Sequence, residues 1–141
     1  MKKHILLVDD DKDELVIFMD VLRRVPAADG FKCTYAASTS QAIEMLKYLV
    51  PDYIFADFNM PGMNGLQFLQ DLKDQQRLNR TQLCLYSTYI NDEVKERAQR
   101  FGISCLKKSD TIHSLAKSLC DLFAGKKQVN YTFGQFLVPT R

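Results

Sequence analysis

Five short apolar segments alternate with five segments of helical spacing, and this order restricts the chain to few folds. The apolar segments cover residues 5–8, 31–37, 52–56, 83–86 and 103–106. After each one, apolar residues recur three or four positions apart, as Leu15, Phe18 and Leu22 do after the first segment. Alternating strands and helices are typical of a parallel sheet with helices on both faces and right-handed crossovers. The order therefore predicts an α/β fold with a five-stranded parallel sheet.

Polar residues at the ends of the helical segments agree with this division. Ser38 followed by Gln41 is typical of a capping box, and Asn64 with Gln67 has the same spacing at the start of the third helix. Gly102 stands where the fourth helix is expected to end. These residues predict helix boundaries independently of the apolar pattern.

Length and composition indicate one domain. The chain has 141 residues, 46% of them hydrophobic, which is enough for one full core and too short for two ordinary domains. We expect a domain over residues 1–125 and a C-terminal tail over residues 126–141. The 19 basic and 17 acidic residues are spread through the chain, a pattern that does not favour binding to nucleic acid or a membrane surface. With neither a secretory signal nor an apolar stretch of about eighteen residues, the sequence predicts a cytoplasmic protein.

Carboxylates directly follow two of the predicted strands. Asp9 and Asp10 come after the strand at 5–8, and Asp57 comes after the strand at 52–56. If the two strands are neighbours, the three carboxylates converge and repel one another unless a cation neutralises them. A hard divalent cation with oxygen ligands suits such a cluster, and Mg2+ fits a site with two or three carboxylates and bound water.

The remaining acidic residues of this region have a simpler interpretation. Asp11, Asp13 and Glu14 would lie in or beside the first turn of a helix, where the helix dipole stabilises negative charge. A calcium loop is a further alternative, because Asp9, Asp11 and Asp13 alternate. Glu14 stands where that loop needs glycine, and this argues against calcium.

Four elements taken together resemble the response-regulator receiver domain. They are the acidic pair after the first strand, Asp57 within the run Asp-Phe-Asn-Met-Pro-Gly-Met-Asn-Gly, Ser87 after the fourth strand, and a lysine after the fifth. The similarity covers residues 4–124 and is closest to the single-domain, chemotaxis-receiver-like form. It implies a flavodoxin-like fold and a two-component phosphorelay in which a histidine kinase or histidine phosphotransfer protein donates the phosphoryl group.

The resemblance also implies a role for each site residue. Asp57 would be the phosphoacceptor, Asp10 a direct Mg2+ ligand, and Asp9 a ligand through water. The backbone carbonyl of Asn59 would be a further metal ligand. Ser87 would donate its hydroxyl to one phosphoryl oxygen, and a lysine would offer its ammonium to another.

Two lysines compete for the last role. Lys107 and Lys108 both follow the fifth strand, and side chains alternate across a strand, so only one of them can point into the acidic pocket. We favour Lys108, with Lys107 as the alternative.

The leading hypothesis is a phosphorylation-switched signalling module without enzymatic activity beyond its own phosphorylation and dephosphorylation. Phosphorylation of Asp57 would change the surface formed by the fourth helix, fifth strand and fifth helix, and a downstream protein target would bind it. One alternative is an Mg2+-dependent phosphohydrolase, which the missing Asp-x-Asp-x-Thr motif argues against. The other is an unphosphorylated scaffold, which the intact carboxylate trio argues against.

The tail is too apolar for a simple disordered end. Val129, Tyr131 and Phe133 alternate, and Phe136, Leu137 and Val138 follow. The tail is expected either to pack on its own domain or to form a strand or hook that docks on a partner or a twin subunit.

Overall fold

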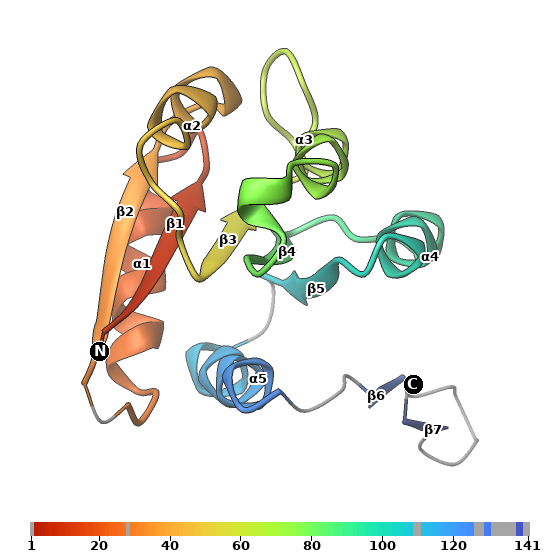
Figure 1. Cartoon of the computed structure of the whole chain (residues 1–141). Coiled ribbons are helices and arrows are strands. Elements are labelled where there is room, and N and C mark those ends of the chain that lie inside the picture. Colours follow the sequence, from red (N-terminus) through yellow and green to blue (C-terminus); the bar gives the residue numbers. More distant parts are fainter. Residues whose placement is uncertain (1, 28, 109–110, 126–128, 131–137, 140–141) are drawn as a thin grey trace.

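Five parallel strands form the centre of the computed structural model, which describes residues 2–27, 29–108, 111–125, 129–130 and 138–139. The strands lie in the order β2-β1-β3-β4-β5 (Figure 1). Their bounds are Lys3–Val8 for β1, Phe31–Ala36 for β2, Tyr53–Ala56 for β3, Gln82–Ser87 for β4 and Ser104–Lys107 for β5. The sheet confirms the predicted flavodoxin-like receiver fold, with strand ends that differ from the sequence-based segments by one or two residues.

Helices cover both faces of the sheet. One face is covered by α1 (Asp13–Arg23) and α5 (Ile112–Phe123), and the other by α2 (Thr39–Met45), α3 (Gly65–Lys73) and α4 (Asp92–Arg100). A short 3-10 helix, Gln76–Leu78, leads into β4. On the α1 and α5 face, the Phe18 ring packs against those of Phe55 and Tyr86, at centroid distances of 5.1 and 5.4 Å.

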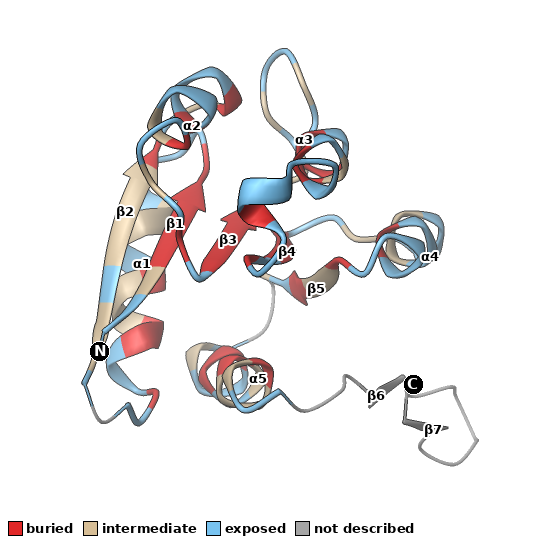
Figure 2. Ribbon diagram, viewed as in Figure 1, coloured by how far each residue is buried: buried red, intermediate tan, exposed pale blue. Residues whose placement is uncertain are grey.

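The central strands are buried on both faces because helices pack on each side (Figure 2). This burial explains why β3 and residues 5–8 of β1 are continuous apolar runs, whereas the edge strand β2 has mostly partly buried residues. The caps agree with the predicted ones: Ser38 Oγ accepts a hydrogen bond from the Gln41 backbone, and Asn64 Oδ1 accepts one from the Gln67 backbone. Gly102, after α4, has a φ of +69°, which favours glycine.

The strand order reverses near the middle of the sheet. From β1 the chain moves outward to β2, and then returns to the other side of β1 to form β3, β4 and β5. The order therefore reverses between β1 and β3. In open α/β sheets, ligands bind beyond the carboxyl ends of the strands at such a point. Val8 and Ala56 end these two strands as register partners, so the residues that follow them meet there.

The described part of the tail forms a short strand pair. β6 (Val129–Asn130) and β7 (Val138–Pro139) pair with each other in antiparallel fashion, in a sheet separate from the five-stranded one. Tyr131, Phe133, Phe136 and Leu137, which the sequence singled out, lie outside the described residues. Neither the boundary at residue 125 nor a docking role of the tail is tested, and both stay predictions.

None of the helices within the described ranges is long and apolar enough to cross a membrane.

Candidate functional site

Three carboxylates converge beyond the ends of β1 and β3. The Asp57 backbone N–H donates to the Val8 carbonyl at 3.0 Å, and the Asp9 backbone N–H donates to the Ala36 carbonyl at 3.1 Å, so both residues continue the pairing of their strands. One carboxylate oxygen from each of Asp9, Asp10 and Asp57 lies within 4.8 Å of the others. Asp9 is 1% exposed and Asp57 9% exposed, whereas Asp10 faces solvent.

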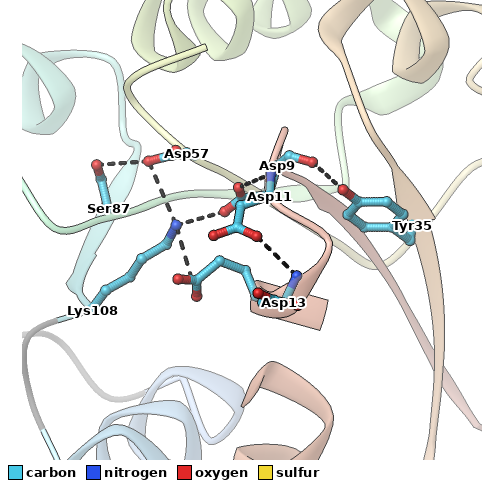
Figure 3. A network of polar contacts seen from close by, with 8 residues as sticks. Asp9, Asp11, Asp13, Tyr35, Asp57, Ser87 and Lys108 are labelled. Atoms are coloured by element: carbon cyan, nitrogen blue, oxygen red, sulfur yellow. Dashed lines mark hydrogen bonds and ion pairs between the residues drawn. The ribbon is translucent and has the colours of Figure 1, made fainter. Parts of the chain in front are cut away.

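The Lys108 side chain extends from the end of β5 into this cluster (Figure 3). Its Nζ lies 2.5 Å from Asp9 Oδ2, 3.7 Å from Asp57 Oδ1 and 3.9 Å from Glu14 Oε2. The Lys108 backbone N–H donates to the Ser87 carbonyl at 3.0 Å, and its ammonium lies 5.4 Å from the centre of the Tyr86 ring. The ammonium is thus stabilised by the carboxylates and by the face of the Tyr86 ring.

Lys107, the alternative lysine, is exposed. It is the last residue of β5 and pairs in register with Ser87. This arrangement agrees with the expectation that only one of the two lysines points into the pocket.

A hydroxyl from β4 also contacts the central carboxylate. Ser87 is buried, and its Oγ donates a hydrogen bond to Asp57 Oδ1 at 2.8 Å. Asp57 therefore meets a hydroxyl and an ammonium on the same oxygen atom, Oδ1. The hydrogen bond from Ser87 and the positive charge of Lys108, 3.7 Å away, both stabilise negative charge on that oxygen.

Asp9 is the most firmly held member of the cluster. Its Oδ1 accepts a hydrogen bond from the Asp11 backbone at 2.9 Å, and its carbonyl accepts one from the Tyr35 hydroxyl at 2.5 Å (Figure 3). Burial raises the pKa of the Asp9 carboxyl, and the hydrogen bond from Lys108 opposes that rise. Burial likewise raises the pKa of the Glu14 carboxyl, against the attraction of Lys108.

The cluster has more acidic than basic groups. Asp9, Asp10, Asp57 and Glu14 supply four carboxylates, and Lys108 is the cation that contacts three of them. The three converging carboxylates are hard oxygen donors, and the exposed side of Asp10 leaves room for the water that Mg2+ retains in proteins. The donor set therefore fits Mg2+. Asn59 is exposed two residues after Asp57, and its carbonyl as a metal ligand stays a prediction.

The structure brings Asp9, Asp10, Asp57, Ser87 and Lys108 to one edge of the sheet, and their individual roles remain predictions.

Three other residues shape the site, although the sequence did not single them out for it. Glu14 was interpreted as a helix-dipole residue but contacts Lys108. Tyr35 fixes the Asp9 backbone from the neighbouring strand, and no local pattern indicates that contact.

Gly65 is the third of these residues. A Cβ atom at this position would lie 1.9 Å from the Asp57 carbonyl oxygen, which is far inside van der Waals contact. The Gly65 backbone N–H donates to the Phe58 carbonyl at 2.9 Å, so the start of α3 is held directly against the turn that carries Asp57. The sequence signal was available, since Gly65 ends the motif that begins at Asp57.

Comparison with known proteins gives consistent results. The family model described as "Response regulator receiver domain" matches residues 5–119. The polar-differentiation response regulator DivK of Brucella ovis is 24% identical over 102 residues, which cover 72% of this chain and 80% of DivK. The chemotaxis response regulator CheY4 of Vibrio cholerae is 24% identical, with a TM-score of 0.71 over 84% of this chain and 97% of CheY4. The phosphorylated cyanobacterial phytochrome response regulator RcpA is 22% identical, with a TM-score of 0.73 over 86% of this chain and 91% of that one.

Proposed function

We propose, from the premise that this chain belongs to the response regulator receiver domain family, that it accepts a phosphoryl group on Asp57 and thereby changes its binding to a downstream protein. Receiver domains are signalling modules of two-component systems, are phosphorylated by histidine kinases and are generally not enzymes. One observation carries the proposal. Ser87 Oγ and Lys108 Nζ lie 2.8 and 3.7 Å from the same oxygen of Asp57, Oδ1, and the carboxylates of Asp9 and Asp10 lie beside it.

The chemistry of the step follows from this arrangement. An oxygen of Asp57 attacks the phosphorus of a phosphohistidine, and a P–O bond forms as the P–N bond breaks. The bond's electron pair stays on the ring nitrogen, and the imidazole, which carries a proton on its other ring nitrogen, leaves as neutral histidine. The Lys108 ammonium and the Ser87 hydroxyl then donate to phosphoryl oxygens instead of to the carboxylate. Mg2+ held by the acidic residues would neutralise charge on the same oxygens. Attack by water on the phosphorus breaks the bond to the Asp57 oxygen, releases inorganic phosphate and restores the carboxylate. These two reactions are the chemistry we assign to the chain.

Intact-mass spectrometry tests the proposal. After incubation with acetyl phosphate and Mg2+, the protein should gain the mass of one phosphoryl group, and with EDTA in place of Mg2+ it should gain none. A protein that stays unmodified under both conditions, while its circular dichroism spectrum shows it to be folded, would contradict the proposal.

Asp10→Ala is expected to weaken Mg2+ binding more than Asp9→Ala. Asp10 is exposed and ready to bind the metal directly, whereas Asp9 is buried, already paired with Lys108, and assigned to act through water. Loss of a direct ligand costs more affinity than loss of a group that orients a bound water. Calorimetric titration with Mg2+ measures both variants, and equal losses would show that the two carboxylates were wrongly ranked.

Lys108→Ala should still accept phosphate but lose the response to it. The ammonium is not the nucleophile, yet it is the group expected to move from Asp9 toward a new phosphoryl group. The response is measured as the change of backbone amide chemical shifts in α4, β5 and α5 on adding beryllofluoride, a phosphoryl mimic. Lys107→Ala is the matched control, because its exposed side chain lies outside the pocket, and it should respond like the wild type. The reverse pattern would assign the role to Lys107.

Removal of residues 126–141 should leave phosphorylation intact, because every proposed site residue precedes the tail. If the tail docks on a partner or a twin subunit, the shortened protein should show less self-association or weaker partner binding. Light scattering of both forms, with and without beryllofluoride, measures the first effect. An unchanged mass and unchanged partner affinity would favour a tail that packs on its own domain.

A further inference from the structure

Glu14 contacts the site lysine from the first turn of α1, although its side chain is not among those that the phosphoryl chemistry needs. Its Oε2 lies 3.9 Å from Lys108 Nζ, on the same ammonium that approaches Asp9 and Asp57. The Glu14 side chain is 19% exposed and that of Lys108 is 9% exposed, so solvent screens this pair only in part.

The position of Glu14 is unfavourable for a carboxylate. Burial raises its pKa, and the charges of Asp9, Asp11 and Asp57 raise it further, whereas the charge of Lys108 lowers it. Interaction with the helix dipole, the role that the sequence suggests for Glu14, needs only an exposed side chain in the first turn, as Asp13 has. Glu14 instead lies near other carboxylates and depends on Lys108 for charge compensation.

A phosphoryl group on Asp57 changes this balance. The phosphoryl group carries about −1.5 to −2 charges in place of the single negative charge of the carboxylate, so the site gains roughly one negative charge close to Lys108, and the group offers strong acceptor oxygens to the ammonium. As Lys108 turns toward the phosphoryl group, Glu14 loses part of its compensation and faces a larger negative charge. The two acceptors therefore compete for one ammonium.

We propose that Glu14 is a positioning residue that holds the Lys108 ammonium back from Asp57 and thereby weakens the binding of a phosphoryl group there. The inference rests on the proposed function, since it concerns the ligand of that same site. Glu14 sets how readily the site changes from the unphosphorylated to the phosphorylated arrangement. It contacts Lys108 and affects the reacting atoms through the position of that ammonium.

Beryllofluoride affinity at saturating Mg2+, followed by the chemical shifts of backbone amides next to Asp57, which report binding itself, tests the inference. Glu14→Gln should bind about three- to tenfold tighter than the wild type, the size expected when one partly exposed ion pair is lost. The matched control is Asp13→Asn, which removes one negative charge from the same helical turn at an exposed side chain, and it should change the affinity less than about twofold. Thermal unfolding of each variant confirms that it is folded.

A second arm separates action through Lys108 from a general effect of charge. In a Lys108→Ala background, where Asp57 and Mg2+ still hold the ligand, Glu14→Gln should change the affinity less than about twofold. Equal tightening with and without Lys108, equal tightening in Asp13→Asn, or an unchanged Kd in Glu14→Gln would overturn the inference. A wild-type protein that binds no beryllofluoride would instead contradict the proposed function, so the two failures are distinguishable.

Discussion

Asp57→Asn and Asp57→Ala proteins will gain no phosphoryl group from acetyl phosphate and Mg2+, whereas the wild type gains one. Asp57 is the carboxylate whose Oδ1 meets both the Ser87 hydroxyl and the Lys108 ammonium. An amide or a methyl group at this position leaves no nucleophilic oxygen where phosphoryl transfer needs one in line with the leaving group. Intact-mass spectrometry of the three proteins under one condition measures the effect.

The matched control is Asp74→Asn, which removes a carboxylate at the exposed C-terminal end of α3. This variant should gain one phosphoryl group like the wild type. Normal labelling of a folded Asp57→Ala protein would remove Asp57 from its assigned role.

Gly65→Ala is expected to destabilise the protein by ~3 kcal/mol, in the range of strong overpacking. The added Cβ would lie 1.9 Å from the Asp57 carbonyl oxygen and 2.7 Å from its carbonyl carbon, and both are backbone atoms that no side-chain rotation can move aside. Relief requires a shift of α3 or of the turn after Asp57. The free energy of unfolding, measured in urea, is the direct readout, and Mg2+ affinity should fall with it because the turn also positions the carboxylate.

Gly62→Ala separates this clash from the general cost of replacing a glycine in the same turn. Gly62 has a φ of +89°, and its Cβ would meet no atom within 4 Å. Its replacement should therefore cost only the backbone strain, ~1 kcal/mol. Equal costs at the two positions would show that the contact between Gly65 and Asp57 does not limit this turn.

The sequence predicted the layers of the fold because each layer has a local signal. Apolar runs of strand length, helical spacing and the caps at Ser38 and Asn64 depend on residues that are near in the chain, and the structure confirms them. Strand ends were less certain: β1 begins at Lys3 rather than Ile5, since backbone pairing with β2 continues through polar residues that carry no apolar signal.

The convergence of the carboxylates was predictable for a different reason. Once the strands at 5–8 and 52–56 are taken as neighbours, the residues after them must meet at one edge. The contacts of Glu14 and Tyr35 were not predictable, because they depend on how α1 and β2 lie against the site. A first-turn glutamate follows the same dipole rule whether it faces solvent or an ammonium, and only the position of Lys108, 94 residues later, separates the two cases.

Chemical mapping of the phosphorylated residue tests the central claim most directly. The protein is phosphorylated with acetyl phosphate and Mg2+ and then treated with borohydride. A first hydride displaces phosphate from the acyl carbon to give an aldehyde, and a second hydride reduces the aldehyde to an alcohol. Peptide mass spectrometry then locates the product. We predict homoserine at position 57 and unmodified aspartate at positions 9 and 10, and homoserine at position 9 or 10, with Asp57 intact, would contradict the assignment of Asp57 as the phosphoacceptor.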